Sequence, residues 1–340
     1  MHGVDAERVA SLTTAGSPAG AVGAPATSQR WAYLGPEGTF TEQAARSLVR
    51  RAELAGGLTE VTLDPVAGVS AALAAVRSGA ADAACVPLES SVEGAVPLTQ
   101  DELTHGDPLL ITAEAYVPIT FDLLVRPGTG LAAIRTVGAH PHGHAQVRAW
   151  VTHTLPDAEA VMSASNAAAA ASVAAGTLDA AAAAPVAGPR YGLISLVSDI
   201  GEVRDAVTRF VLLRRPGPPP RPTGNDRTSL VLSVGNHPGS LLAVLTEFAS
   251  RGINLTRLES RPTRSKLGEY VFLVDADGHL SEPAMADVLA ALSRRAALLR
   301  WLGSYPRIEG TNVPAADFAT ANAYTTAIDQ VRRWQLGDRT

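Results

Sequence analysis

Residues 229–260 read SLVLSVGNHPGSLLAVLTEFASRGINLTRLES, and this stretch decides how the last third of the chain folds. Its β-branched and leucine residues predict one strand over 229–234 and another over 253–260. Between them, apolar residues recur at the three- and four-residue spacing of an amphipathic helix over 239–250. The residues of this apolar stripe, which we expect in the core, are Leu241, Val244, Leu245 and Phe248.

The residues that follow complete a recognisable unit. A strand is expected over 269–275, a helix over 282–293 and a last strand over 298–302. The order strand, helix, strand, strand, helix, strand is that of the ferredoxin-like βαββαβ unit. The C-terminal part of the chain is therefore predicted to be a small, independent α/β layer.

A proline-rich segment precedes this unit. Residues 215–223 read RPGPPPRPT, a composition that prevents helix and sheet pairing and favours a stiff extended spacer. The spacer divides the chain into a large and a small domain. In the large domain short β-prone runs alternate with helical windows, which indicates α/β layers around a mainly parallel sheet. The expected strands cover residues 31–34, 82–86, 135–137, 179–183 and 207–213.

Two segments of the large domain resemble each other. In each, a helix stops at a glycine, Gly79 or Gly176, and after a short turn a strand starts at an aspartate, Asp82 or Asp179. A proline follows soon after the end of each strand. The recurrence indicates two similar lobes with a cleft between them, where small ligands usually bind.

Composition restricts the class of protein. The 340 residues carry a formal net charge of −5, so the chain has no domain-scale basic field to attract nucleic acid or anionic lipid. We therefore expect neither a nucleic-acid partner nor a membrane partner. The single cysteine, Cys85, lies in an apolar stretch and fits a reducing, cytoplasmic compartment.

The two ends of the chain differ from the middle. Residues 1–30 are rich in Ala, Gly, Ser, Pro and Thr and fit neither a secretory signal nor a transmembrane helix, so a disordered tail is predicted. Residues 307–340 form a C-terminal tail that contains a weak amphipathic pattern through Ile328, Val331 and Trp334. This pattern predicts either a helix that docks on the body or on a partner chain, or a loosely packed tail.

Two polar segments follow predicted strands in the first half of the large domain. Residues 34–41, LGPEGTFT, leave a strand through glycines and enter a helix, where backbone N–H groups can hold a carboxylate or a phosphate. Residues 87–94, PLESSVEG, place the hydroxyls of Ser90 and Ser91 and the carboxylate of Glu89 after another strand. The alternative for both segments is ordinary capping of a helix or turn. Neither has the glycine spacing of a nucleotide-binding loop.

The second half of the large domain offers comparable candidates. Ser165 and Asn166 occupy the equivalent strand-to-helix junction, again with capping as the alternative. His140, His142 and His144 lie close together, which suggests a metal site. No carboxylate stands at a recognisable ligand offset, however, and we expect solvated or capping histidines rather than a metal centre.

The last predicted strand of the large domain contains Thr208, Arg209 and Phe210. A guanidinium group suits an anionic substrate because it makes bidentate contacts to carboxylates, and a hydroxyl can donate to a leaving oxygen. In an alternating strand Thr208 and Phe210 share one face and Arg209 takes the other. Arg209 is therefore expected either to bind substrate or to brace the lobe through an ion pair.

These segments, in this order, resemble the prephenate dehydratase family of the two-domain bacterial type over residues 31–306. Residues 34–40 are similar to the family's G-P-x-G-T-F segment, and residues 259–262 reproduce the E-S-R-P motif of its regulatory ACT domain. The other matching segments are residues 89–91 (E-N-S in the family), 208–210 (T-R-F), 239–242 (G-A-L-V) and 302–306, the usual ending.

The resemblance implies an α/β fold with a two-lobed catalytic domain over 31–214, similar to periplasmic-binding-protein-like folds. A linker over 215–226 and a ferredoxin-like βαββαβ ACT domain over 227–306 would follow. The implied activity is the conversion of prephenate to phenylpyruvate, carbon dioxide and water, with L-phenylalanine as feedback ligand. No metal or cofactor is implied, and a cytoplasmic homodimer or homotetramer is expected.

The resemblance also assigns roles to residues. Thr208 is implied to be the catalytic hydroxyl. Residues implied to bind substrate are Thr39, Phe40, Glu89, Ser90, Ser91, Ser165, Asn166, Arg209 and Phe210. Residues implied to bind phenylalanine are Asn236, Pro238, Gly239, Ser240, Leu241, Leu242, Glu259, Ser260, Arg261 and Pro262.

Two departures from the family pattern leave alternatives open. Ser90 replaces the asparagine of E-N-S, so a shorter hydroxyl stands where an amide is usual, and a water could fill the gap. Ser240 replaces the alanine of G-A-L-V, a small change that is expected to preserve the turn. The alternatives are a relative that acts on arogenate or on another prephenate-like acid, and a catalytically weak phenylalanine sensor.

Overall fold

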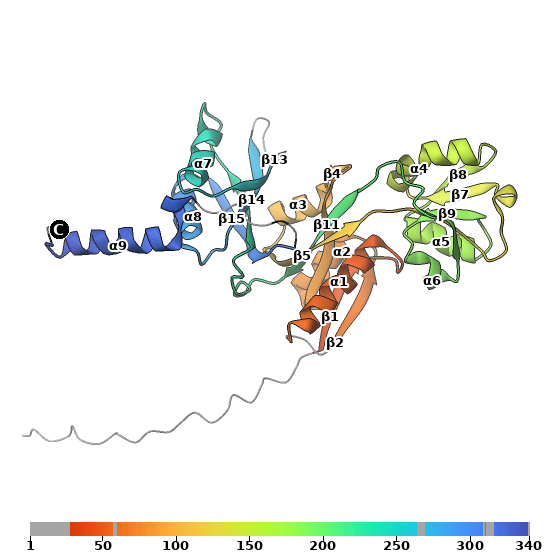
Figure 1. Cartoon of the computed structure of the whole chain (residues 1–340), viewed down its shortest axis with the longest axis horizontal. Coiled ribbons are helices and arrows are strands. Elements are labelled where there is room, and N and C mark those ends of the chain that lie inside the picture. The colour runs from red at the N-terminus through yellow and green to blue at the C-terminus, as the bar shows by residue number, and fades with distance from the viewer. Residues whose placement is uncertain (1–27, 57–59, 264–268, 309, 311–315, 339–340) are drawn as a thin grey trace, which may run out of the picture.

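The computed structural model describes residues 28–56, 60–263, 269–308, 310 and 316–338. It contains two lobes and a small C-terminal domain arranged in a row (Figure 1). The first lobe lies in the middle, with the second lobe on one side and the small domain on the other. Among the described residues no helix is both long and apolar enough to cross a membrane.

The first lobe is built on a sheet of strand order β2-β1-β3-β11-β5, with the short β4 paired to β3. The strands are β1 (Ser28–Leu34), β2 (Glu60–Val66), β3 (Ala83–Ser90), β4 (Gly94–Ala95), β5 (Leu110–Pro118) and β11 (Val207–Arg214). Its helices are α1 (Phe40–Leu54), α2 (Val69–Ser78) and α3 (Pro97–His105). Apolar side chains of α1 and of α2 pack into separate core clusters with the strands.

The second lobe is an insertion between β5 and β11. Its sheet has the order β10-β6-β9-β7-β8. The strands are β6 (Asp122–Val125), β7 (Thr136–Ala139), β8 (Glu159–Met162), β9 (Ala180–Ala183) and β10 (Ile194–Val197). The helices are η1 (Leu131–Ala133), α4 (Pro141–Thr154), α5 (Asn166–Ala174) and α6 (Ala187–Tyr191).

The expectation of a mainly parallel sheet is wrong for half of each lobe. In the first lobe β1 is parallel to β2 and β3, whereas β11 is antiparallel to β3 and β5. In the second lobe β7 is parallel to β8 and β9, whereas β6 is antiparallel to β9 and β10. The chain leaves the first lobe through β5 and returns through β11. Two neighbouring strands that carry the chain out to the same insertion and back again must run in opposite directions.

The resemblance between the two lobes is visible in the structure. Asp82, just before β3, accepts a hydrogen bond from the backbone N–H of Arg30 in the neighbouring β1 at 2.8 Å. Asp179, just before β9, accepts from the backbone N–H groups of Arg135 and Thr136 beside the neighbouring β7 at 2.9 and 3.0 Å. Because these bonds favour the charged form, the pKa of Asp179 is lowered. Each aspartate therefore joins a new strand to its parallel neighbour.

The small domain has the predicted βαββαβ order. Its sheet has the order β13-β14-β12-β15. The strands are β12 (Asp226–Ser233), β13 (Leu255–Pro262), β14 (Tyr270–Asp277) and β15 (Leu298–Pro306), and the helices are α7 (Ser240–Ala249) and α8 (Pro283–Arg295). Both helices pack on one face of the sheet, where Val244 and Phe248 of α7 meet Val288 and Leu292 of α8.

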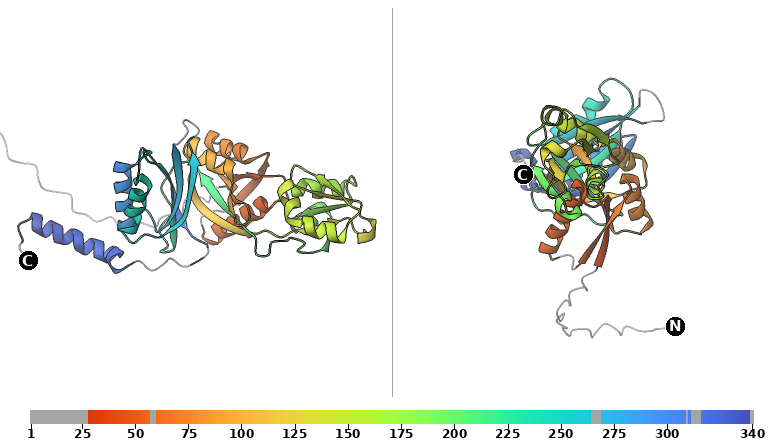
Figure 2. Two further views of the ribbon diagram at one scale, coloured as in Figure 1. Left: turned by 90° about the horizontal axis from the view of Figure 1, so that it is seen from above. Right: turned by 90° about the vertical axis from the view of Figure 1, so that its right-hand side faces the viewer.

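The other face of the small domain's sheet packs on the first lobe (Figure 2). One apolar cluster contains Val211 and Leu213 of β11 together with Leu273 of β14 and Tyr305 of β15. The proline-rich segment thus connects two bodies that share a core, and it does not hold them apart. It is itself anchored, because Arg215 donates to the carbonyl of Val76 in α2 at 2.7 Å and to that of Ala81 after the helix at 3.1 Å.

The ends of the chain differ partly from expectation. Residues 28–30 were assigned to a disordered tail, but they form the start of β1 and pair with residues 60–62 of β2. The rest of that predicted tail, residues 1–27, lies outside the described residues. The predicted C-terminal helix is present as α9 (Ala321–Gln335), preceded by η2 (Asp317–Ala319), and its apolar residues Ile328, Val331 and Trp334 are exposed.

Close approach of the two packed sheets depends on Gly303 of β15. Its φ of +137° is strained for other residues, and a β-carbon there would collide with the backbone of Ile111 in β5. We expect Gly303→Ala to lower the free energy of unfolding by about 2–4 kcal/mol through overpacking and backbone strain. Gly201→Ala is the control, because its β-carbon meets only an ordinary contact with Phe121. Equal midpoints of urea unfolding for the two variants would contradict the expectation.

Candidate functional site

A cavity of about 800 Å³ lies between the two lobes. Its floor is formed by the segments that connect them, with Ile119 and Phe121 on the outgoing segment and Ala206 on the returning one. Phe121 meets Phe40 of α1 edge to face, with 5.7 Å between ring centroids. The cavity therefore has a largely apolar base, as ligand sites that exclude water usually do.

The first turns of α1, α4 and α5 line the cavity. The lining residues at these starts are Thr39 to Thr41, then His140, His142 and Gly143, and Ser165 to Ala168. The positive ends of three helix dipoles thus meet in one space, a geometry that favours an anionic ligand. Of the residues that the structure describes, those lining the cavity include neither lysine nor arginine.

The loop before α1 is held by a capping box. Thr39 accepts from the backbone N–H of Glu42 at 3.2 Å and donates to the carbonyl of Leu34 at 3.2 Å. The buried carboxylate of Glu42 accepts from the N–H of Gly38 at 2.5 Å and forms an ion pair with Arg46 at 2.6 Å. The hydroxyl of Thr39 therefore caps the helix, and the loop presents its backbone to the cavity.

A second set of contacts holds α4 against α5. Ser165 accepts from the N–H of Ala168 at 2.9 Å, so its hydroxyl is also a helix cap. Asn166 accepts from the N–H of His140 at 2.7 Å. A β-carbon at Gly143 would collide with the amide of Asn166, so glycine allows this close packing. The sequence-predicted Ser165 and Asn166 do line the cavity, and they fix its far wall.

Strands β3 and β11 form the near wall. The structure extends β3 through Ser90, whereas the sequence predicted a loop from residue 87. Ser90 and Thr208 are register partners and line the cavity, and Phe210 also lines it. The hydroxyl of Ser90 accepts from the N–H groups of Val92 and Glu93 at 3.2 and 3.4 Å and shapes the turn after the strand.

Three residues expected to bind substrate do not line the cavity. Glu89 and Arg209, which are register partners, extend from the opposite face of the sheet because side chains alternate along a strand. Arg209 therefore takes the bracing role that was one of its two predicted roles. Ser91 accepts from the N–H of Val207 at 2.9 Å and ties the end of β3 to the start of β11.

The hydroxyl of Thr208 differs from the hydroxyls that serve as caps. Thr208 is nearly buried, yet within the described part of the chain no group hydrogen-bonds to its Oγ1. An unpaired hydroxyl at the wall of a ligand-sized cavity can donate a hydrogen bond to a bound molecule. Thr208 therefore offers the cavity an unpaired hydroxyl, as does Thr41 of α1, whose Oγ1 also has no hydrogen-bond partner among the described residues.

Several polar cavity residues were not predicted as site residues. His140 and His142 stack with 5.2 Å between ring centroids, and Nδ1 of His142 contacts the carboxylate of Glu93 of the first lobe across the cavity. Burial, together with the neighbouring His142, lowers the pKa of His140. Gln146 also reaches Glu93, at 3.5 Å. The sequence singled out the histidines only as a rejected metal site, and only the tertiary fold brings Glu93 and Gln146 to them.

A further contact between the lobes involves the loop before α1. Tyr191 donates to the carbonyl of Glu37 at 2.7 Å, and Arg190 forms an ion pair with the Glu37 carboxylate. The lobes are thus joined by polar contacts on both sides of the cavity. None of the described residues form a group of three or more His, Cys, Asp and Glu able to hold a metal ion.

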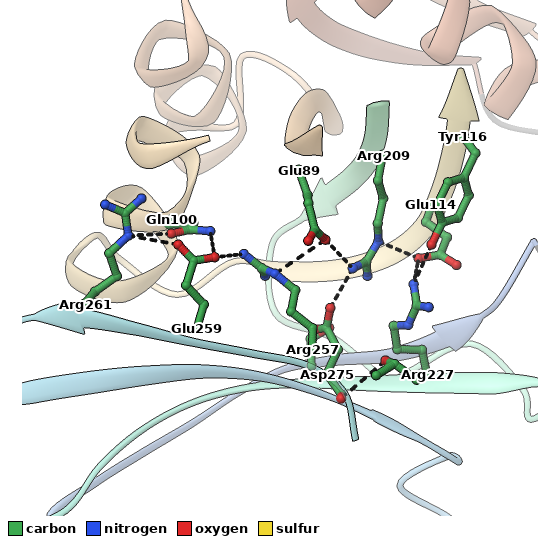
Figure 3. A network of polar contacts seen from close by, with 12 residues as sticks. Glu89, Gln100, Glu114, Tyr116, Arg209, Arg227, Arg257, Glu259, Arg261 and Asp275 are labelled. Carbon is green, nitrogen blue, oxygen red and sulfur yellow. Dashed lines mark hydrogen bonds and ion pairs between the residues drawn. The ribbon is translucent and has the colours of Figure 1, made fainter. Parts of the chain in front are cut away.

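A buried polar network lies on the other side of the near wall, where the first lobe meets the small domain (Figure 3). Arg209 donates to Glu114 at 2.8 Å, to Asp275 at 2.6 Å and to Tyr305 at 2.7 Å. Arg227 donates to the same Glu114 at 2.5 Å. Residues from both domains therefore share two buried carboxylates.

Comparison with known proteins places this architecture in a family. The family model "Prephenate dehydratase" matches residues 31–218, and the model "ACT domain" matches residues 228–294. The first of these covers more than half of the chain.

The chain belongs to the prephenate dehydratase family. It is 49% identical over 311 residues to the prephenate dehydratase of Amycolatopsis methanolica, an alignment that covers 91% of this chain and 99% of that one. A solved prephenate dehydratase from Arthrobacter aurescens, in complex with L-Phe, is 42% identical with a TM-score of 0.82, covering 90% of this chain and 99% of that one. The solved GqqA, described as a novel type of quorum quenching acylase, is 30% identical with a TM-score of 0.71, covering 82% and 98%.

The ACT motifs of this prephenate dehydratase family member lie on two elements. Residues 236–239 form an exposed turn before α7, and Leu242 at the start of that helix is exposed. Residues 259–262 end the edge strand β13. There Glu259 and Arg261 both bond to Gln100 of α3 in the catalytic domain, each at 2.7 Å. The E-S-R-P segment thus contacts the catalytic domain within one chain.

The buried network makes stability depend on pH. Burial alone raises the pKa of Asp275, but the charges of Arg209, Arg257 and Arg227 outweigh it and lower the pKa to about 2. In the unfolded chain an aspartate titrates near pH 4. The stabilisation by charged Asp275 is therefore complete above about pH 4 and is lost as the pH falls from about 4 towards 2.

We expect Asp275→Asn to lower the free energy of unfolding at pH 7 by about 3–5 kcal/mol, because Arg209 loses a buried partner. Between pH 5 and pH 3 the free energy of unfolding should fall by about 1 kcal/mol more in the wild type than in the variant, so the difference between the two proteins becomes smaller. Urea unfolding at each pH measures both effects. Asp64→Asn, which removes a partly exposed partner of Arg30, is the control and should change little. If the difference in unfolding free energy between wild type and Asp275→Asn stayed constant from pH 5 to pH 3, Asp275 would not have the lowered pKa that we assign to it.

Proposed function

We propose that this protein converts prephenate to phenylpyruvate, carbon dioxide and water, and that L-phenylalanine inhibits it through the ACT domain. The support is the family of both domains and the near full-length similarity to a protein named prephenate dehydratase. The single observation that carries the proposal is the position of Thr208, whose hydroxyl faces the inter-lobe cavity without a partner among the described residues.

The electrostatics of the cavity support a dianionic substrate. Prephenate carries two carboxylates, and the first turns of α1, α4 and α5 offer backbone N–H groups from three directions. Thr39, Phe40, Ser90, Ser165, Asn166 and Phe210 all line this space, and we propose that they contact the substrate or shape its site. We assign Glu89, Ser91 and Arg209 to supporting roles, because they hold the strands from outside the cavity.

The proposed reaction breaks two bonds of the substrate. The ring carboxylate leaves as carbon dioxide, its electron pair completes the aromatic ring, and the ring hydroxyl leaves as hydroxide that one proton converts to water. Thr208 donates a hydrogen bond to the departing oxygen in the transition state. Threonine is too weak an acid to give up its own proton near pH 7, so the proton of the water is relayed through the hydroxyl. Aromatisation of the ring supplies the driving force, and the protein accelerates the reaction mainly by holding the substrate in position.

We further propose that phenylalanine binds at residues 236–242 and 259–262 and that the protein is a cytoplasmic homo-oligomer of at least two chains. The support for the ligand is that a solved relative of 42% identity contains L-Phe. The exposed turn before α7 and the unpaired edge of β13 are accessible to a ligand or to a second chain. The buried, single Cys85 fits a reducing compartment.

Formation of phenylpyruvate from prephenate by the purified protein, with and without phenylalanine, tests the proposal. We expect turnover that phenylalanine suppresses. A folded protein that binds phenylalanine but shows no turnover would favour the sensor alternative. Preferred turnover of arogenate over prephenate would favour the altered-substrate alternative and would implicate Ser90. Because GqqA shows that this fold supports an acylase, hydrolysis of an acyl amide is the activity to assay if neither acid reacts.

Replacing Thr208 separates chemistry from folding. We expect Thr208→Val, which keeps the shape and removes the hydroxyl, to lower kcat by about 10²–10³-fold with little change in KM. Thr208→Ser should retain most of the activity because it restores the donor. Unfolding midpoint and phenylalanine binding should match the wild type in both variants. Comparable kcat in Thr208→Val and in the wild type would exclude Thr208 as the catalytic hydroxyl.

A further inference from the structure

Arg257 of β13 connects the E-S-R-P segment to the near wall of the cavity, which we call the catalytic wall, within one chain. Its Nη2 donates to Glu259 at 2.6 Å, and its Nε lies 3.5 Å from the carboxylate of Glu89. Glu259 belongs to the E-S-R-P segment, whereas Glu89 is the penultimate residue of β3 and directly precedes the cavity residue Ser90. One guanidinium group therefore lies between a carboxylate of each domain (Figure 3).

The catalytic side of this contact is the reverse face of the cavity wall. Glu89 is the register partner of Arg209, as Ser90 is of Thr208. Arg209 also lies 3.9 Å from Glu89. A shift of the Glu89 carboxylate is thus transmitted to the two strand ends that carry the cavity hydroxyls, with no intervening flexible loop.

The regulatory side depends on Glu259, which has several competing cationic and amide partners. It accepts from Arg257 and from Gln100, at 2.6 and 2.7 Å, and it lies 3.3 Å from Arg261. An amino-acid ligand bound at this segment brings an ammonium group, which competes for the Glu259 carboxylate. Arg257 would then lose its closer partner, and Glu89 is the carboxylate that still forms an ion pair with it.

Other contacts between the domains are less suited to switching. The bonds of Arg209 to Glu114 and Asp275 are short, and all three groups are at least 95% buried. Moving any one of them would leave a buried charge without its partner. The contact of Arg257 with Glu89 is long, the side chain of Glu89 is 39% exposed, and the buried Nε of Arg257 has no hydrogen-bond partner among the residues that the structure describes. A group that switches between two states needs two arrangements of similar energy. Arg257 meets this requirement, because it can approach either Glu259 or Glu89.

We propose that Arg257 is the residue through which ligand binding at β13 reaches the catalytic wall, by exchanging its closer contact from Glu259 to Glu89. This rests on the proposed function for the identity of the ligand, phenylalanine. In the unliganded protein Arg257 is held by Glu259 and Ser90 keeps its place in the cavity. In the liganded protein the guanidinium draws Glu89 towards the small domain, and the end of β3 moves with it.

The test compares inhibition with binding in the full-length protein. For Arg257→Gln we expect the phenylalanine concentration that halves prephenate turnover to rise at least 10-fold. The dissociation constant for phenylalanine, measured by calorimetry, and kcat and KM without phenylalanine should stay within about 3-fold of the wild type. A purely structural role would change binding and inhibition together, so their separation is the diagnostic result.

Two further variants control the experiment. Arg251→Gln removes an arginine of the same domain whose polar partners among the described residues, such as Glu247 and Asp287, all lie in the small domain, so inhibition should stay normal. Arg257→Lys retains the charge without the bridging geometry and should weaken inhibition by a smaller factor, and it serves as the test variant if Arg257→Gln does not fold.

The outcomes distinguish this proposal from the proposed function. Normal inhibition in a folded Arg257 variant, or equal loss in Arg251→Gln, would overturn the role of Arg257 and leave the enzyme assignment intact. A wild type that turns over prephenate and ignores phenylalanine would overturn the regulatory assignment, and the role of Arg257 with it. Absence of prephenate turnover in the wild type would overturn the proposed activity itself.

Discussion

The buried guanidinium of Arg209 is the constraint on which the rest of the structure depends. It donates to Glu114 of its own lobe and to Asp275 and Tyr305 of the small domain, all of them nearly inaccessible to solvent. Taking these charges out of water is costly, and the cost is recovered only while every partner is in place. The catalytic and ACT domains therefore behave as one folding unit on this side. The apolar cluster that both domains share supports the same conclusion.

The opposite side of the same sheet has a different electrostatic character. The cavity attracts anions with the starts of helices and carries no fixed cation among the described residues of its lining. Helix dipoles are weaker than a paired arginine and act only over the first turn. Such a site can hold a dianion during reaction and release a product that carries one carboxylate fewer. Polar contacts across the cavity, such as His142 with Glu93, position the lobes around it.

Sequence patterns predicted the small domain well because its signal is local. The stripe ending in Phe248 sets the helix, and short β-prone runs set the strands. Family motifs also found the cavity hydroxyls, including Thr208. Long-range features were harder to predict. The direction of β11 follows from the insertion of a whole lobe, and the partners of Arg209 come from residues 66 to 96 positions away.

The all-alanine strand β9 shows how context and propensity interact. Alanine favours helices, yet residues 180–183 are a fully buried strand, because small side chains let α5 pack closely on the sheet. The sequence predicts a strand over 179–183 both as a short β-prone run and through its likeness to the segment at Asp82, and the structure has β9 there. The polar residues missed in the cavity, such as Gln146 and Tyr191, belong to helices whose surface patterns are unremarkable.

The alternation along β3 and β11 has a consequence for how this family can change. Thr208 and Ser90 face the cavity while Arg209 and Glu89 face the ACT domain. Neighbouring positions near the ends of these strands therefore contact different sides of the sheet. Loss or gain of one residue in either strand would exchange the two sets, placing a charged guanidinium in the cavity and a hydroxyl in the ionic interface. The pairing already shifts by one residue between Arg209 and Phe210, and a further change of length beside Thr208 and Ser90 would be costly. Variation in length should therefore be confined to the loops, and the two strands should keep a fixed number of residues across the family.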